Sequence, residues 1–213
     1  MSRTRLLIAD DHTIILEGIG MLLAEEFDVV GTAQDGHAVL RAAEQLRPDV
    51  TLLDISMPLL NGIDTCRQLV KSLPRSRVIF LTMHADRIYV EEAFRAGCVG
   101  YLLKRAAASE LSGAINTVMR GGKYVTPLIE WNEATKNIGQ TEVQTTASER
   151  LTARQREVLQ LVAEGRANKE IAALLHVSEK TVDYHKSSIK RELLLESTAE
   201  LTQFAIKHRI IGI

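Results

Sequence analysis

Five side chains with the chemistry of phosphoryl transfer stand at the ends of short apolar runs in the first half of the chain: Asp10, Asp11, Asp54, Thr82 and Lys104. An aspartate can act as the nucleophile, a lysine can neutralise the moving phosphoryl group, and a threonine hydroxyl can donate to its oxygens. Carboxylates that converge repel one another unless a cation lies among them, and such oxygen ligands suit Mg²⁺. Each residue alone is weak evidence, because an aspartate at a strand end is more often a helix cap. The set together predicts a Mg²⁺-dependent phosphoryl site.

The apolar runs before these residues predict five buried strands that alternate with helices. Runs such as LLIA and VIFL are apolar on both faces, as expected of parallel strands covered by helices on both sides. In such a doubly wound α/β fold, functional groups gather at the carboxyl ends of the strands. The predicted strands are Leu6–Ala9, Val29–Ala33, Val50–Leu53, Val78–Leu81 and Gly100–Leu103, and the predicted helices are His12–Glu25, Gly36–Leu46, Asn61–Lys71, Arg87–Ala96 and Ala107–Met119.

The second half of the chain has a different organisation. Residues 123–147 are rich in Thr, Asn, Gln and Glu and predict a linker, with a candidate short helix around Pro127–Ile138 that carries Trp131. From Leu151 onward the apolar spacing is helical, and a tight turn between the second and third helices predicts a helix-turn-helix. We therefore expect an α/β domain at 1–122, a linker at 123–147 and a small all-α domain of four helices at 148–213.

Local signals place the ends of these last helices. Thr152 and Gln155 have the spacing of a capping box, Gly165 is placed to end the first helix, and Ser178 is placed to begin the third. The predicted helices are Ala153–Glu164, Lys169–Leu175, Glu179–Leu194 and Thr198–His208.

Charge and composition narrow the class of protein. The net charge is -1, and residues 148–213 carry 11 Lys/Arg against 9 Asp/Glu, so charge alone does not identify a nucleic-acid-binding protein. Cys66 and Cys98 form neither a zinc-ligand pattern nor a CxxC pair. No apolar run approaches the ~18 residues of a membrane span, and the first run is too short for a signal peptide. We expect a cytoplasmic protein with no membrane partner.

The segments IADDH, LLDISMPLLNG, FLTMH and GYLLK resemble the receiver domain of two-component response regulators. The resemblance implies a flavodoxin-like, five-stranded sheet of strand order 2-1-3-4-5, with a sensor histidine kinase as phosphoryl donor. It implies that Asp54 is the phosphoacceptor and that Lys104 and Thr82 assist the transfer. It implies that Thr82 and Tyr101 form a switch pair. The implied ligands of Mg²⁺ (or Mn²⁺) are Asp10, Asp11, Asp54 and the backbone carbonyl of Ser56.

Two positions near this site differ from other proteins with similar motifs. Arg105 follows Lys104 where the family often has a cis proline, so we expect a trans bond there, because a cis bond before another residue costs about 2.5–4 kcal/mol. Ser56 stands where aspartate-dependent phosphatases carry their general acid. An enzyme that acts on outside substrates is therefore not expected, and the chain would promote only its own phosphorylation and dephosphorylation.

The segment LTARQREVLQLVAEGRANKEIAALLHVSEKTVDYHKSSIKREL resembles the LuxR-type (NarL/FixJ) helix-turn-helix. The resemblance implies that Glu179–Leu194 enters the major groove of double-stranded promoter DNA. Lys186 is a further candidate for a phosphate contact. The implied DNA-binding residues are Lys180, Thr181, Asp183, Tyr184, His185, Ser187, Lys190 and Arg191.

Several positions depart from the usual LuxR-type pattern. Asp183 stands at a position that is usually basic, where it can accept from cytosine N4 or pair with Lys186. Ala167 replaces the usual serine cap, and Leu194 replaces a common glycine. The last helix resembles a dimerisation helix, with packing inside the domain as the alternative role of its apolar residues. The candidate dimer contacts are Leu201, Phe204 and Ala205.

These features together predict a DNA-binding transcriptional regulator switched by phosphorylation of Asp54, which forms a homodimer when phosphorylated. The alternative is a constitutive DNA-binding regulator whose receiver serves only for dimerisation. A small-molecule-sensing regulator is disfavoured by the low aromatic content of 4% and by the strand–helix repeats.

Overall fold

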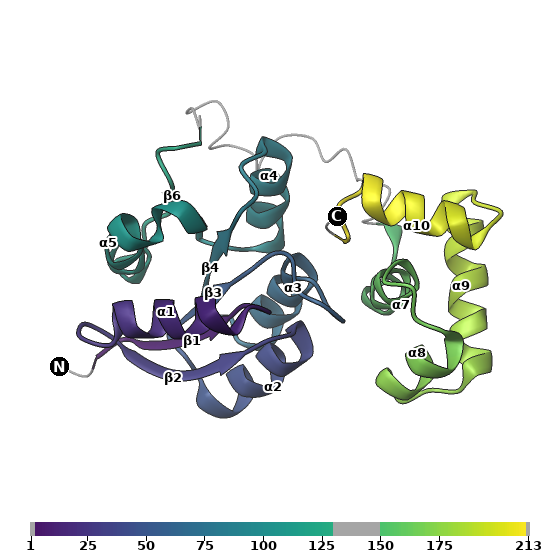
Figure 1. Cartoon of the computed structure of the whole chain (residues 1–213), viewed down its shortest axis with the longest axis horizontal. Coiled ribbons are helices and arrows are strands. Elements are labelled where there is room, and N and C mark those ends of the chain that lie inside the picture. Colours follow the sequence, from purple (N-terminus) through teal and green to yellow (C-terminus); the bar gives the residue numbers. More distant parts are fainter. Residues whose placement is uncertain (1–2, 130–149, 212–213) are drawn as a thin grey trace. The chain divides into compact units, whose positions relative to one another are not determined.

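The computed structural model describes residues 3–129 and 150–211. The chain divides into two compact units, Met1–Thr141 and Glu142–Ile213, which we call the α/β domain and the helical domain and describe separately (Figure 1). Trp131 and most of the predicted helix around Pro127–Ile138 lie outside the described residues. No helix within 3–129 or 150–211 has the length and apolar character needed to span a membrane.

The α/β domain is built on a parallel sheet of order β2-β1-β3-β4-β5-β6. The order of the first five strands confirms the predicted doubly wound fold. Because β1 lies between β2 and β3, the chain reverses its direction of winding there, and polar residues at the carboxyl ends of β1 and β3 become neighbours. The strands are β1 (Arg5–Ala9), β2 (Asp28–Ala33), β3 (Val50–Leu53), β4 (Arg77–Thr82), β5 (Gly100–Leu103) and β6 (Tyr124–Val125).

The sixth strand corrects the expectation of a five-stranded sheet. It lies within the range expected to be linker, where Tyr124 N donates to Val99 O at 3.0 Å and Thr126 N donates to Tyr101 O at 2.9 Å. Two residues are too few for a strand pattern to show in the sequence. The strand forms because the backbone at the edge of β5 is available to pair with these residues.

Helices cover the two faces of the sheet, with α1 and α5 on one side and α2, α3 and α4 on the other (Figure 1). Side chains alternate along each strand. In β1, Leu6 and Ile8 therefore pack with α1 and α5, while Leu7 and Ala9 pack with the other layer. This double burial explains the continuous apolar runs. The helices are α1 (Thr13–Leu23), α2 (Gly36–Leu46), α3 (Gly62–Ser72), α4 (Arg87–Ala96) and α5 (Ala107–Met119), with a 3₁₀ turn, η1 (Lys104–Ala106), before α5.

The helical domain has the four predicted helices: α7 (Ala153–Ala163), α8 (Asn168–Leu174), α9 (Glu179–Leu193) and α10 (Thr198–Lys207). Its predicted caps are present. Thr152 and Gln155 exchange both capping-box hydrogen bonds at 2.8 and 3.2 Å. Ser178 Oγ accepts from Thr181 N at 3.1 Å, and Gly165 has a φ of 81°. Only half of a capping box begins α8, where Glu170 accepts from Ala167 N at 2.8 Å.

Candidate functional site

Three of the predicted phosphoryl-site residues meet at the carboxyl edge of the sheet. Lys104 Nζ lies 2.8 Å from Asp54 Oδ2 and 2.7 Å from Asp10 Oδ2. Asp10 and Asp54 follow the adjacent strands β1 and β3, whereas Lys104 follows β5, two strands beyond β3. Its long side chain spans that distance and joins the two carboxylates through one ammonium group.

The electrostatics of this cluster favour a charged lysine. Burial, the largest single influence, disfavours the ammonium form. Hydrogen bonds and charge from Asp10 and Asp54 outweigh it and raise the pKa of Lys104 above its ordinary value. Asp10 and Asp54 are only 2% and 4% exposed, so their charges need this partner. The site is thus a buried cluster of two carboxylates and one ammonium group.

Asp11 and His12 form the exposed side of the cluster. His12 Nδ1 lies 2.8 Å from Asp11 Oδ1 and 3.2 Å from Asp10 Oδ1. His12 was expected inside the first helix; it stands instead just before α1, and its side chain does not cap that helix. Its position directly after two aspartates is the only sequence signal for this role.

The carboxylates fit the predicted divalent cation. One ligand atom from each of Asp10, Asp11 and His12 lies within 4.8 Å of the others, and Asp54 shares Lys104 with Asp10. Aspartate oxygens are the ligands that Mg²⁺ and Mn²⁺ prefer. Asp10, Asp11 and Asp54 are therefore suited to hold such an ion.

The backbone around Asp54 is tightly constrained. A Cβ on Gly62 would lie 1.9 Å from the Asp54 carbonyl oxygen, so the start of α3 can approach Asp54 only with glycine at this position. Ile55 N donates to Asp54 Oδ1 at 2.7 Å, and Asp54 N donates to Ala9 O at 2.9 Å. These contacts hold the carboxylate in one orientation. No cis peptide occurs in the described ranges, so the Lys104–Arg105 bond is trans, as expected.

His84 connects the predicted switch residues with each other, a role that sequence reasoning missed. Its backbone N donates to Thr82 Oγ1 at 3.3 Å, and its carbonyl accepts from the Tyr101 hydroxyl at 2.8 Å. Its ring lies 2.8 Å from Ser56 Oγ through Nε2 and stacks on Tyr89 at 4.0 Å. Tyr101 is fully buried, and burial raises its pKa well above the ordinary value. The only signal in the sequence was the position of His84 two residues after a strand-end threonine.

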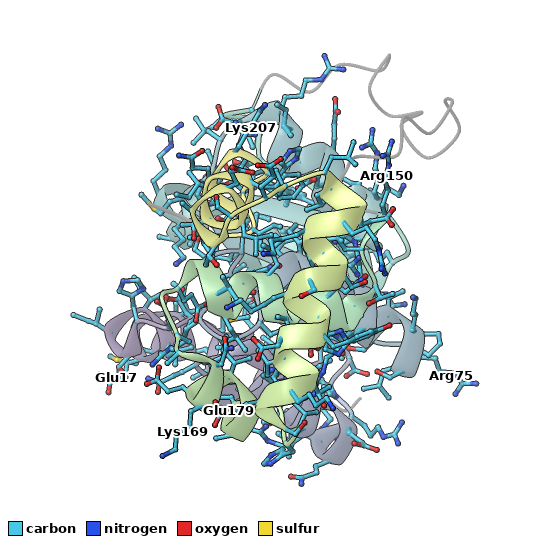
Figure 2. The ribbon with its side chains drawn as sticks, turned by 90° about the vertical axis from the view of Figure 1, so that its right-hand side faces the viewer. Glu17, Arg75, Arg150, Lys169, Glu179 and Lys207 are labelled. Atoms are coloured by element: carbon cyan, nitrogen blue, oxygen red, sulfur yellow. The ribbon has the colours of Figure 1, made fainter. Side chains whose placement is uncertain are left out.

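In the helical domain, α9 presents the predicted DNA-binding residues on its outer side, and Figure 2 looks onto this helix, with Glu179 at its first turn. Val182 and Ile189 are fully buried and form its inner side. Thr181, His185 and Lys190 are half-buried, and burial together with the charge of Arg154 lowers the pKa of His185. The exposed members of the predicted set are Lys180, Asp183, Tyr184, Ser187 and Arg191.

Contacts from α7 fix the position of the helix-turn-helix. Arg154 donates to Glu157 at 2.9 Å and to the carbonyl of Leu175 at 2.6 Å, which ties α7 to the end of α8. Gln155 Nε2 donates to Ser188 Oγ at 3.1 Å, which ties α7 to α9. The outer side of α9 is therefore held on a rigid frame.

The direct pair considered for Asp183 and Lys186 is replaced by a bridge. Asn168 Nδ2 donates to Asp183 Oδ1 at 2.6 Å, and Lys186 Nζ donates to Asn168 Oδ1 at 3.0 Å. Lys190, predicted as a phosphate contact, donates to the carbonyl of Glu196 at 3.3 Å. Asn168 was not among the predicted DNA-site residues, because its partners lie on another helix.

Two of the three predicted dimer contacts are buried inside the domain. Leu201 and Ala205 are fully buried where α10 packs against α7, so in this structure they have the alternative role of core residues. Phe204 is half-buried and stacks on His208 at 4.0 Å. Helical spacing shows that a face is apolar but does not show which surface covers it.

Comparisons with known proteins find a matching family for each of the two domains. Residues 6–116 match the family described as response regulator receiver domain, and residues 149–205 match the bacterial regulatory proteins, luxR family. The oxygen regulatory protein NreC of Staphylococcus carnosus is 38% identical, over 97% of this chain and 99% of the relative. The transcriptional regulatory protein MctR of Rhizobium johnstonii is 35% identical, over 99% and 96%.

Solved structures of similar chains cover both domains of this protein. The RcsB response regulator of Salmonella typhimurium is 29% identical with a TM-score of 0.60, covering 96% of this chain and 97% of that one. A structure of an RcsB–DNA complex is 28% identical with a TM-score of 0.55, covering 95% and 98%. The chain therefore belongs to the two-component response regulators that join a receiver domain to a LuxR-family DNA-binding domain.

Proposed function

We propose that Asp54 accepts a phosphoryl group from a sensor histidine kinase and that this reaction controls binding of promoter DNA by the helical domain. The observation that carries the proposal is the buried cluster in which Asp54 and Asp10 share the ammonium group of Lys104 at 2.8 and 2.7 Å. Phosphoryl transfer requires a nucleophile and a cation placed beside it, and this cluster holds both.

The residues of the cluster have distinct roles in the transfer. A carboxylate oxygen of Asp54 attacks phosphorus, and the bond between phosphorus and the donor histidine nitrogen breaks with its electrons on that nitrogen. Lys104, paired with Asp54 before the reaction, then pairs with the oxygens of the new acyl phosphate. Asp10, Asp11, Asp54 and the backbone carbonyl of Ser56 would hold a Mg²⁺ ion, which would neutralise part of the phosphoryl charge.

His84 lies where phosphorylation would be sensed. The Thr82 hydroxyl accepts from the backbone of His84, while the Tyr101 hydroxyl donates to the same residue. An acyl phosphate on Asp54 offers the Thr82 hydroxyl a new acceptor, and a shift of His84 then removes the partner of Tyr101. The modification acts by stabilising one of two arrangements of this loop.

The output of this switch is DNA binding by α9 in the major groove. Lys180 and Arg191 are exposed on this helix and suit phosphate contacts, which supply affinity but little sequence choice. Thr181, Asp183, Tyr184, His185, Ser187 and Lys190 complete the proposed surface. A homodimer formed on phosphorylation would place two such helices on two half-sites.

Intact mass after treatment with a small phosphodonor tests the first step. We expect a gain of one phosphoryl group that requires Mg²⁺ and is abolished by Asp54→Asn, because the amide is a poor nucleophile. Glu91→Gln, at an exposed ion pair on α4, serves as the control and should gain the group normally. An unchanged mass of the original protein, with DNA binding intact, would favour the constitutive regulator.

A further inference from the structure

We infer that Asn168 is a positioning residue for the reading of DNA sequence: its amide holds Asp183 and Lys186 as one unit that reads a cytosine in the major groove. The inference rests on the proposed DNA-binding role of α9.

The partners of the bridge fix the orientation of the Asn168 side-chain amide. The amide nitrogen of Asn168 donates to Asp183 Oδ1 at 2.6 Å, and its oxygen accepts from Lys186 Nζ at 3.0 Å. The reverse orientation would place donor against donor and acceptor against acceptor. Asp183 and Lys186 are three residues apart on α9 and therefore lie on one face, while Asn168 reaches them from the first turn of α8. Both side chains are thus held before DNA arrives.

The charges explain why such a unit is needed. An exposed carboxylate on a helix that enters the groove is repelled by the phosphates on both sides. The Asn168 amide and the nearby ammonium of Lys186 offset that repulsion locally and hold the carboxylate in one rotamer. Within the described helical domain, Asp183 Oδ2 has no hydrogen bond and can accept only. Cytosine presents its N4 donor in the major groove, and an aspartate is suited to accept from it.

A purely structural bridge between α8 and α9 predicts a different behaviour. Loss of Asn168 would then lower the stability of the domain and leave the preferred DNA sequence as it was. Loss of a positioning residue instead changes the base preference at one position. The preference of the bound DNA is therefore the measurement that separates the two roles.

The test is selection of DNA by the full-length protein from a pool of randomised duplexes, with and without prior phosphorylation, followed by affinity measurements on the enriched sequence. We expect cytosine at one position of each half-site. Asp183→Ala should reduce that preference about 5- to 150-fold. Asn168→Ala should reduce it at least about twofold, and adding it to Asp183→Ala should change nothing further, because the two residues act through one contact.

Two further variants sharpen the result. Asn168→Asp combined with Asp183→Asn keeps one hydrogen bond between the two positions and an acceptor for Lys186. It should move the preference from cytosine to adenine, the base that an asparagine amide contacts in bidentate fashion. Lys169→Ala is the control, because Lys169 is exposed on the same helix and points outward (Figure 2); it should leave the base preference unchanged.

The outcomes that contradict the inference are distinct from those that contradict the proposed function. An identical enriched sequence for the original protein and a folded Asn168→Ala variant would overturn the positioning role. A retained cytosine preference in Asp183→Ala would do the same. Should the original protein enrich no sequence at all, the proposed DNA-binding function fails and this inference with it. Circular dichroism of each variant establishes whether it is folded. If Asn168→Ala does not fold, the double variant Asn168→Asp with Asp183→Asn decides the question through its base preference.

Discussion

At the scale of single residues, the chain places a large apolar side chain where backbone geometry favours glycine. Leu194 ends α9 with a φ of 56° and is 90% exposed. A left-handed conformation costs a residue with a Cβ roughly 1–2 kcal/mol, and an exposed side chain recovers little of that cost by packing. The end of the recognition helix is therefore held in an unfavourable conformation.

Leu194→Gly should stabilise the helical domain by about 0.5–1 kcal/mol, because glycine adopts this φ freely but gains freedom in the unfolded chain. Hydrogen exchange of the buried amides in α7 and α9 of the full-length protein measures the change. Leu195→Gly is the matched control, since the described backbone has no positive φ at Leu195, and that variant should be less stable. Slower exchange in the control than in Leu194→Gly would contradict the explanation.

At the scale of elements, the central strand β3 carries a polar group that its surroundings do not satisfy. Thr51 is fully buried, and its Oγ1 has no hydrogen-bond partner among the described residues. A buried hydroxyl without a partner costs about 1–3 kcal/mol. The β-branched shape of threonine suits the strand, so the cost arises from the hydroxyl alone.

Thr51→Val should raise the free energy of unfolding of the α/β domain by about 1 kcal/mol, because it keeps the shape and removes the hydroxyl. Chemical denaturation followed by the circular dichroism of the full-length protein measures this. Thr65→Val is the comparison, since the Thr65 hydroxyl donates to Asn61 O at 2.8 Å and its loss should destabilise. Equal effects of the two changes would show that the Thr51 hydroxyl is satisfied in solution.

At the scale of the whole molecule, the helical domain should respond to mild acid. Burial, with the charge of Arg154, lowers the pKa of His185, and burial, with the charge of Lys207, lowers the pKa of His208. In the unfolded chain both imidazoles titrate near their ordinary value of 6.5. Below that pH the unfolded state binds more protons than the folded state.

The stability of the helical domain should therefore be fully present above pH 6.5 and fall as the pH drops below it, until the lowered pKa values of the folded state are passed. Hydrogen exchange of the α7 and α9 amides, corrected for the intrinsic rate, measures this across the range. His208→Gln should make the dependence shallower, whereas His176→Gln, at an exposed histidine of the same domain, controls for the loss of an imidazole. If the stability of the helical domain instead rises as the pH falls, the predicted direction of the pH dependence is wrong.

The elements of both domains were predictable because their signals are local. The continuous apolar runs along β1, β3, β4 and β5 reflect strands that are buried on both faces. The helical spacing between these runs reflects helices that are buried on one face. The caps at Thr152 and Ser178 depend on residues three positions apart, which the sequence shows directly. The convergence of Asp10, Asp54 and Lys104 followed from the rule that parallel strands end at one edge of the sheet.

The remaining features depend on contacts between residues far apart in the chain, and packing alone decides these. Strand β6 exists because an edge of β5 is available. His84 joins Thr82 to Tyr101 because the loop that follows β4 meets the side chain of Tyr101 on β5. Leu201 is a core residue because α7 covers it, although its spacing fits a dimer contact equally well. Asn168 meets Asp183 because the turn between α8 and α9 sets the angle of the two helices, and one-dimensional periodicity contains no information about that angle.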